Sequence, residues 1–269
     1  MYGAILGDIV GSRFEFDRGG KTKDFEFITE ECTITDDTVM TIAVAEALMK
    51  VADEDDETIK KELINSMKKW GHKYPYAGYG YRFCHWLFSN DSHPYNSYGN
   101  GSAMRVSSAG WLYDSLERTR HVARLTAEVT HNHPEGIKGA DCTAAVIYLG
   151  RTGHSKEEIK DFVIKEYGYD FSLTLDEMRE RHAHVETCMD SLPKALRSFF
   201  DGESVEDAIR NAVSLGGDTD TLAAIAGAMA EGYYRNAYRA NWHTKFTGNE
   251  IMTVCLEFPY FVRQRGIEI

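Results

Sequence analysis

Hydrophobic residues recur at helical spacing along most of the chain, and almost no stretch shows the alternation of a β-strand. The segment 73–98 breaks the pattern: aromatic residues crowd between glycines and prolines, and we interpret it as a loop. We therefore expect an all-α fold, a single compact multi-helix domain spanning residues 1–269. Helices are predicted over residues 1–11, 33–50, 55–71, 117–130, 136–149, 156–167, 192–200, 205–215, 221–234 and 250–263, with a further one opening near residue 102.

The first predicted helix carries glycine at every fourth position, at Gly3, Gly7 and Gly11. Glycine in a helix costs up to about 1 kcal/mol relative to alanine, so a stripe of three indicates that another helix approaches closely. Asp8 interrupts the apolar run, and Glu15 follows seven residues later. On a continuous helix these two carboxylates would share one side, although Glu15 could already lie past the helix end.

Two short segments, each rich in side-chain oxygen, precede helical patterns. A helix N-terminus accepts one capping side chain, and Asp and Thr are ordinary caps, so capping is the simple interpretation. Two adjacent aspartates exceed that need. If the segments converge, their carboxylates and hydroxyls suit a two-metal centre with ions about 3.5–4 Å apart, although the sequence does not show that they meet. The segments are Thr35, Asp36, Asp37 and Thr38, and, after Gly216 and Gly217, Asp218, Thr219, Asp220 and Thr221.

A third pattern, NSYGNGSAMR over residues 96–105, ends the aromatic segment. Gly99 and Gly101 flank Asn100 and leave backbone amides unobstructed, while Ser102 can cap the helix that follows. Free amides at a helix start bind phosphate or sugar oxygens. The pair His131 and His133 has ligand-like spacing, but no third nitrogen or sulfur ligand is near, so we favour a substrate-contacting or structural role over zinc.

Composition narrows the function classes. The net charge is -12, from 30 basic and 42 acidic residues, which argues against broad affinity for nucleic acid. Five scattered cysteines without CxxC spacing favour neither a disulfide framework nor a structural zinc site. No apolar run reaches the roughly 18 residues of a membrane span, and the N-terminus has no basic leader. We expect a cytoplasmic monomer without a membrane anchor.

Together these motifs resemble the ADP-ribosylglycohydrolase family, which includes the enzyme that reactivates dinitrogenase reductase. The resemblance spans nearly the whole chain and lies in the order and spacing of the motifs more than in any one of them. It is carried by GAILGDIVGSRFEF within residues 1–16, TDDT at 35–38, YGNGSAMR at 98–105, THNHPEG at 130–136 and SLGGDTDT at 214–221.

The resemblance implies an all-α fold of the ADP-ribosylglycohydrolase type with a binuclear Mg²⁺ or Mn²⁺ centre at helix N-termini. It places Glu15 as a mobile glutamate near the metals, with Glu15 or Asp37 as general acid or base. Gly99, Asn100, Gly101 and Ser102 would border the diphosphate and ribose, and His131 the substrate cleft. The implied metal ligands are Thr35, Asp36, Asp37, Asp218, Asp220 and Thr221.

The resemblance also implies hydrolysis of the bond between the distal ribose of ADP-ribose and an acceptor. We expect a metal-dependent hydrolase acting on ADP-ribosylated protein, with arginine as the acceptor; serine and small-molecule ADP-ribose conjugates remain open. Two alternatives stand beside it: a catalytically silent, crystallin-like or ADP-ribose-binding member, and a metal-dependent phosphohydrolase using the same carboxylates.

Overall fold

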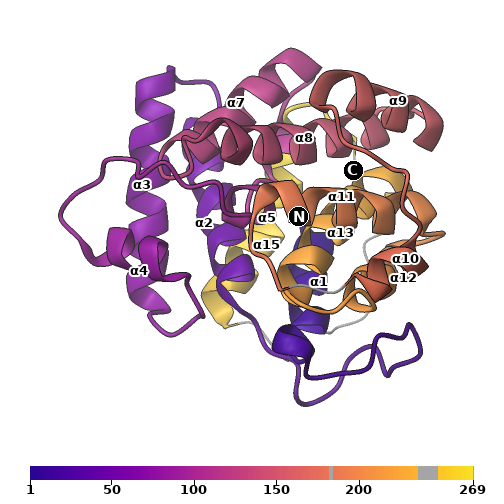
Figure 1. The fold of residues 1–269 in the computed structure, drawn as a ribbon. Coiled ribbons are helices and arrows are strands. Elements are labelled where there is room, and N and C mark those ends of the chain that lie inside the picture. Colours follow the sequence, from indigo (N-terminus) through magenta and orange to yellow (C-terminus); the bar gives the residue numbers. More distant parts are fainter. Residues whose placement is uncertain (182–183, 236–247, 269) are drawn as a thin grey trace.

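The computed structural model describes residues 1–181, 184–235 and 248–268, and this part of the chain is helical without strands, which confirms the all-α prediction (Figure 1). One turn of 3-10 helix, η1 (Glu15–Asp17), follows α1. The α-helices are α1 (Tyr2–Gly11), α2 (Asp36–Val51), α3 (Asp56–Lys73), α4 (Tyr81–Phe88), α5 (Gly101–Met104), α6 (Ala109–Leu112), α7 (Leu116–Glu128), α8 (Pro134–Arg151), α9 (Lys156–Tyr167), α10 (Leu175–Glu180), α11 (Cys188–Asp201), α12 (Val205–Val213), α13 (Thr219–Tyr234) and α15 (Asn249–Gln264).

Helices α1 and α13 pack backbone against backbone near the centre of the molecule (Figure 1). The glycine stripe of α1 makes this possible, because a Cβ atom at any of the three positions would collide with a carbonyl oxygen of α13. The contact runs in opposite directions along the two helices, so the end of α1 lies beside the start of α13. The collisions are Gly3 with Gly227 at 2.2 Å, Gly7 with Ala223 at 2.1 Å and Gly11 with Thr219 at 2.5 Å.

Both ends of this helix pair are tied by hydrogen bonds. At one end the amino group of Met1 forms a buried ion pair with Glu231, which also accepts from the amide of Gly3 at 2.9 Å. At the other end the hydroxyl of Thr219 donates to the carbonyl oxygen of Gly11 at 2.9 Å. These hydrogen bonds fix how far α1 can slide along α13, while the glycine contacts fix the distance between the two helices.

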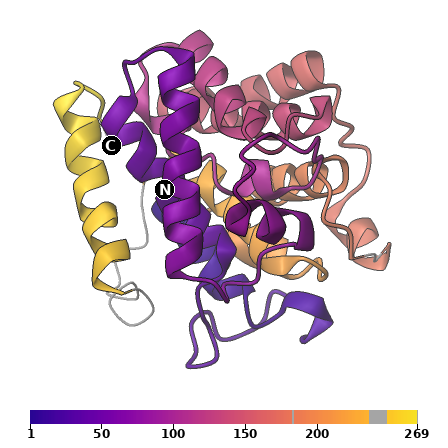
Figure 2. The same cartoon turned by 90° about the vertical axis from the view of Figure 1, so that its left-hand side faces the viewer.

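The other helices surround this pair. α13 also contacts α8, α11 and α12, and α2 lies between α1 and α3. α15 lies at one edge of the molecule, where it packs against α2 (Figure 2). Large apolar side chains such as Trp70 and Phe199 are almost fully buried between the helices.

The structure corrects two parts of the prediction. The segment 73–98 is not wholly a loop, because α4 forms within it and buries Phe83, Trp86 and Leu87 on one face. The spacing of these three residues is helical, but the neighbouring glycines and prolines obscured it. The short α10 was also missed, although Thr174 and Glu177 form a capping box at its start.

Within the described residues, no helix combines the length and the apolar character needed to cross a bilayer.

Candidate functional site

Three segments that are far apart in the sequence meet at one end of the central helix pair. The antiparallel contact of α1 with α13 brings η1, which follows α1, next to the N-terminus of α13. The amide of Phe16 donates to the carbonyl oxygen of Gly217 at 3.2 Å. The N-terminus of α2 joins them through Asp8 on α1. The expected convergence of the two oxygen-rich segments therefore occurs.

Asp8 holds the start of α2 in place. Its carboxylate is fully buried and accepts from the amides of Thr35 and Thr38, each at 3.0 Å. It also accepts from both threonine hydroxyls, at 2.8 Å from Thr35 and at a shorter distance from Thr38. Burial raises the pKa of Asp8, and the hydrogen bonds from Thr35 and Thr38 oppose that rise. Four donors on one carboxylate fix the TDDT turn against α1.

Capping does not account for the aspartates. At the start of α2 the side-chain cap is Thr35, which accepts from the amide of Asp37 at 3.2 Å. At the start of α13 the N-cap residue is Asp218, and its side chain makes no capping hydrogen bond. Gly216 and Gly217 precede it with φ angles of 75° and 77°, a conformation that glycine adopts readily. Helix capping therefore does not explain why aspartates occupy these positions.

The carboxylates gather closely. One oxygen from each of Glu15, Asp218 and Asp220 lies within 4.8 Å of the others. The hydroxyl of Thr221 donates to Oδ2 of Asp37 at 3.0 Å, while Oδ1 of Asp37 is buried and has no hydrogen-bond partner. No lysine or arginine in the described part of the chain forms an ion pair with these groups. An all-oxygen set of this kind matches the ligand preference of Mg²⁺ or Mn²⁺.

Burial and mutual repulsion raise the pKa values of these groups. Burial, then Asp8 and Asp218, raise the pKa of Asp36 to about 8. Burial and Asp218 raise the pKa of Glu15 to about 7. The pKa values of Asp37 and Asp220 are also raised, first by burial and then by neighbouring carboxylates. The cluster therefore requires either protons or cations to be stable.

A cavity of about 350 Å³ opens over this cluster. One wall is formed by Glu15 and the aspartates, and the rest of the lining includes aromatic, glycine and basic residues together with Glu186. The residues that line it are Glu15, Phe16, Asp36, Asp37, Gly78, Gly80, Tyr81, Arg82, Phe83, Tyr95, Ser97, Gly99, Asn100, Gly101, Met104, Arg105, His131, Glu186, Asp218, Asp220 and Thr221.

The glycine turn at Gly99 and Gly101 lines the cavity as expected, but its amides are less free than predicted. The amide of Gly99 donates to Oγ of Ser97 at 3.1 Å, and that of Asn100 to the carbonyl oxygen of Glu186 at 3.0 Å. Gly99 also forms an isolated β-bridge with Thr187. Glu186 and Thr187, which precede α11, thus hold the glycine turn in place through backbone contacts.

Asn100 lines the cavity and Ser102 does not. The side-chain amide of Asn100 donates to Oδ2 of Asp218 at 2.6 Å, so Asn100 orients a carboxylate of the cluster. Ser102 does not cap the following helix, whose N-cap residue is Asn100. Its hydroxyl is buried and donates to the carbonyl oxygen of Gly136 at 2.7 Å, away from the cavity lining.

His131 lines the cavity above the glycine turn. Its Nε2 atom lies 3.2 Å from the position that a Cβ of residue 101 would take, which favours glycine there. Burial, Arg105 and Arg82 lower the pKa of His131 well below its usual range. His131 therefore contributes to the site as a neutral imidazole.

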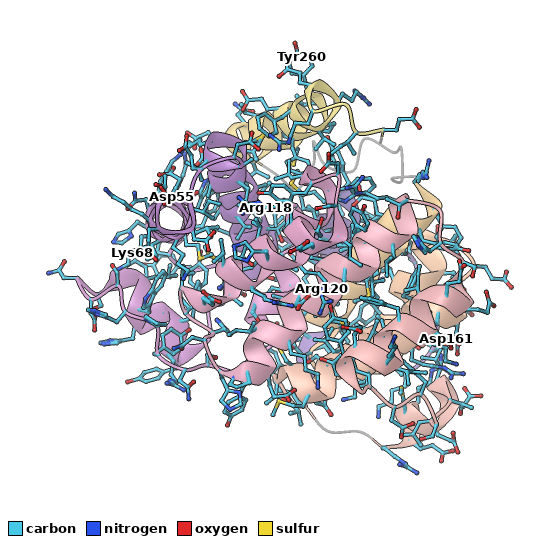
Figure 3. All side chains as sticks on the ribbon, turned by 90° about the horizontal axis from the view of Figure 1, so that it is seen from above. Asp55, Lys68, Arg118, Arg120, Asp161 and Tyr260 are labelled. Carbon is cyan, nitrogen blue, oxygen red and sulfur yellow. The ribbon has the colours of Figure 1, made fainter. Side chains whose placement is uncertain are left out.

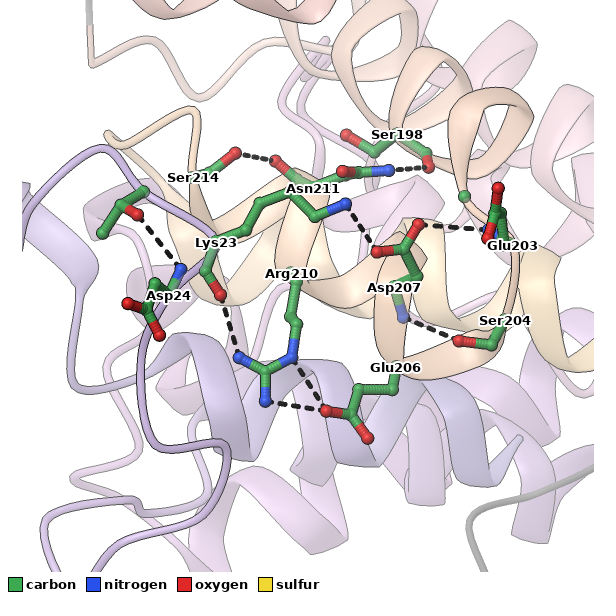
Figure 4. A network of polar contacts seen from close by, with 12 residues as sticks. Lys23, Asp24, Ser198, Glu203, Ser204, Glu206, Asp207, Arg210, Asn211 and Ser214 are labelled. Carbon is green, nitrogen blue, oxygen red and sulfur yellow. Dashed lines mark hydrogen bonds and ion pairs between the residues drawn. The ribbon is translucent and has the colours of Figure 1, made fainter.

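The segment of residues 18–35, which follows η1 and its Glu15, is attached to α12. Residues 18–35 extend from the bottom of the helical body in Figures 1 and 2. Arg210 on α12 donates to the carbonyl oxygens of Lys23 at 2.9 Å and Phe25 at 2.7 Å, and Lys23 forms an ion pair with Asp207 (Figure 4). The Arg210 guanidinium also lies 4.8 Å from the ring centre of Phe25.

Sequence reasoning did not assign four charged residues that line the cavity or support its wall. Asp8 gave a signal, a carboxylate inside an apolar helix, but its partners could not be read from the sequence. Arg82, Arg105 and Glu186 gave none, because their positions depend on contacts between distant segments. Glu186 at the cavity mouth contacts His184 at 2.8 Å.

A larger cavity of about 560 Å³ lies elsewhere, over the start of α7. Arg118 and Arg120, labelled in Figure 3, line it. Arg120 pairs with Asp141 at 2.8 Å and with Glu166 at 3.3 Å, and Arg124 pairs with the same Asp141 at 2.7 Å. The arginines of this groove are therefore held in ion pairs, unlike the carboxylates of the acidic cavity.

Comparisons with known proteins identify the family of the chain. A family model described as ADP-ribosylglycohydrolase matches residues 1–255. ADP-ribosylhydrolase ARH3 of Homo sapiens is 27% identical over 99% of this chain and 93% of its own length. ADP-ribosyl-[dinitrogen reductase] glycohydrolase of Rhodospirillum rubrum is 25% identical over 86% of this chain and 83% of its own.

A solved structure described as an ADP-ribosylglycohydrolase-related protein complex has the same fold. Its TM-score is 0.70 at 23% sequence identity, and the match covers 97% of this chain and 95% of that one.

Proposed function

Since the chain belongs to the ADP-ribosylglycohydrolase family, we propose that it hydrolyses the glycosidic bond between ADP-ribose and a protein arginine, with two divalent cations as cofactors. The observation that carries this proposal is the convergence of Glu15 and four aspartates on one wall of the cavity, where no lysine or arginine of the described residues forms an ion pair with them. A carboxylate-rich wall stabilises the positive charge that develops on the sugar during glycosidic cleavage.

The cations would be Mg²⁺ or Mn²⁺. The buried Oδ1 of Asp37, which has no protein partner, supports this assignment because such an atom is costly without a ligand. When bound, the cations would polarise a water or a sugar hydroxyl. The residues that would hold them are Thr35, Asp36, Asp37, Asp218, Asp220 and Thr221.

Glu15 is the better candidate for proton transfer. Its pKa near 7 allows it to accept or release a proton at neutral pH, and it lines the cavity while only half buried. Asp37 is almost fully buried and one of its oxygens is already bound by Thr221. We therefore assign proton transfer to Glu15 and a ligand role to Asp37.

The mouth of the cavity supports a cationic acceptor. Glu186 and Glu15 both line it, and Glu186 contributes to raising the pKa of Glu15. A negative potential of this kind favours a guanidinium over a neutral hydroxyl. Gly99, Gly101 and His131, which also line the cavity, would contact the ADP-ribose moiety.

The test is release of free ADP-ribose from arginine-linked and serine-linked ADP-ribosyl peptides, with Mg²⁺ or with a chelator. We expect release from the arginine-linked peptide that requires the cation. Release from the serine-linked peptide alone would overturn the acceptor, and AMP or phosphate as product would indicate a phosphohydrolase.

Two variants test the metal assignment. Asp218→Ala and Asp220→Ala should each lower turnover by about a hundredfold or more, since each removes a charge from the cation site. Unchanged turnover in both would remove the basis for the assignment. No release by folded wild-type protein with bound Mg²⁺ would instead favour a binding role.

A further inference from the structure

A chain of hydrogen bonds leads from a buried arginine to the cavity histidine. Nη2 of Arg105 donates to the carbonyl oxygen of Thr126 at 3.0 Å and to the hydroxyl of Thr130 at 2.7 Å. The same hydroxyl lies 2.7 Å from Nδ1 of His131. Arg105, Thr130 and His131 are all buried, so water does not compete for these bonds.

The direction of the second bond follows from counting protons. An arginine only donates, so the Thr130 oxygen must act as acceptor toward Arg105. The hydroxyl then has one proton left to give. Among the described residues its only acceptor is Nδ1 of His131. Donation by Thr130 requires Nδ1 to be unprotonated.

The opposite tautomer satisfies fewer groups. If Nδ1 of His131 carried the proton and donated to Thr130, the Thr130 hydroxyl would hold a buried proton without an acceptor. A doubly protonated ring would meet the same conflict, and its charge would be repelled by Arg105. The lowered pKa of His131 agrees with a neutral ring.

We propose that Arg105 and Thr130 are positioning residues that fix His131 in its Nε2–H tautomer, so that a hydrogen-bond donor faces the cavity above Gly99 and Gly101. Nε2 contacts no hydrogen-bond partner within the described part of the chain and lies on the side of the glycine turn. The group that it would bind is a sugar or phosphate oxygen with a free lone pair. This last step rests on the proposed function, because ADP-ribose would supply that oxygen.

The tautomer can be read directly from the free protein. Long-range ¹H–¹⁵N correlation spectra of protein labelled with ¹⁵N-histidine distinguish a protonated from an unprotonated ring nitrogen, and His131→Asn identifies the signals of His131. We expect Nε2 protonated and Nδ1 unprotonated in the wild type at neutral pH. A protonated Nδ1 or an equal mixture would overturn the proposal, whatever the enzyme hydrolyses.

Substitutions then separate positioning from folding. Thr130→Val removes the hydroxyl at nearly constant shape, and should allow the Nδ1–H tautomer and weaken ADP-ribose binding, measured by calorimetry, by about tenfold. Thr130→Ser should retain both properties. Thr126→Val is the matched control, because Thr126 is also fully buried but its hydroxyl bonds only the carbonyl oxygen of Ala123.

The outcomes are distinct. If Thr130→Val behaves like Thr126→Val in both the spectrum and the affinity, the positioning role is wrong. If the wild type shows the Nε2–H tautomer but does not bind ADP-ribose, the proposed function fails while the assignment of the tautomer stands.

Discussion

Asp8 illustrates how a single residue organises the site without lining the cavity. Its carboxylate receives four hydrogen bonds from Thr35 and Thr38 and no cation neutralises it within the described residues. Its charge also raises the pKa values of Asp36 and Asp37. Asp8 thus holds the TDDT turn in place, and its negative charge favours the binding of a proton or a cation by Asp36 and Asp37.

We predict that Asp8→Asn destabilises the protein by about 2–3 kcal/mol, because an amide nitrogen would face donors that now bind a carboxylate oxygen. It should also weaken Mg²⁺ binding, since the TDDT turn loses its attachment. Chemical denaturation and metal titration measure the two effects. The control is Asp55→Asn at the exposed N-cap of α3, where asparagine caps equally well. Equal stability of the two variants would contradict this role for Asp8.

At this scale the sequence indicated the chemistry but not the contacts. The TDDT and DTDT segments could be found because four oxygen-bearing side chains in a row exceed what a helix cap requires. The hydrogen bond from Asn100 to Asp218 was not predictable, because the partner of an amide is decided by the packing of α5 against α13. The carboxylate set was thus predictable, and the groups that orient it were not.

At the scale of elements, two helices direct their N-termini into one space. A helix N-terminus carries partial positive charge, which favours nearby carboxylates, but it offsets only part of their mutual repulsion. Burial, and then the neighbouring carboxylates, raise the pKa values of Asp36 and Glu15. The start of α2 and the start of α13 are therefore held together against electrostatic repulsion.

A pH dependence follows for the metal-free protein. Asp36 has an ordinary pKa of 3.8 and a folded value of about 8, and Glu15 an ordinary value of 4.5 and a folded value of about 7. The folded state then holds more protons than the unfolded state between about pH 4 and pH 8, so the free energy of unfolding should fall as pH rises through this window.

Thermal unfolding in chelator across that range measures this effect. Added Mg²⁺ should stabilise most at the alkaline end, where the carboxylates are ionised, and little at the acid end. A metal-free protein whose stability rises from pH 5 to pH 8 would contradict the assigned pKa shifts.

The segment of residues 18–35, which follows Glu15, gives a second prediction at this scale. Arg210→Met keeps the aliphatic stem beside Phe25 but removes the hydrogen bonds to Lys23 and Phe25. We expect faster proteolysis of residues 18–35 and a lower kcat. The affinity for Mg²⁺ should be nearly unchanged, because Arg210 contacts none of the aspartates of the proposed cation site. Arg197→Met is the control, since Arg197 pairs with Asp201 on α11 and not with this segment. A kcat equal to that of the control would argue against the fastening role.

At the scale of the whole molecule, the antiparallel contact of α1 with α13 decides where the site forms. The glycine stripe was recognised in the sequence as a sign of close packing, and the all-α fold followed from helical periodicity. The partner helix and its direction were not predictable, because any helix with small residues would have satisfied the pattern. α4 was missed for the opposite reason: local glycines and prolines concealed a face defined by Phe83, Trp86 and Leu87.

We predict that Gly7→Ala destabilises the protein by about 3 kcal/mol, because the new Cβ would lie 2.1 Å from the carbonyl oxygen of Ala223 and the two backbones must separate. Gly20→Ala in the exposed segment after η1 should change stability by less than about 0.5 kcal/mol, since its nearest atom lies 3.7 Å away. Chemical denaturation compares them. Similar denaturation midpoints for the two variants would show that α1 and α13 can move apart at little cost.

The backbone contact between α1 and α13 has a consequence for how this scaffold can change. Where two helices meet through side chains, their separation varies with the volume of those side chains. Here the peptide groups themselves touch. The distance between Glu15 and the start of α13 is therefore fixed by backbone geometry and not by the volume of side chains. Substitutions in the surrounding core can then accumulate without changing the distances between the carboxylates. Redesign for a new substrate should alter the residues at the cavity mouth and leave the contact between α1 and α13 unchanged.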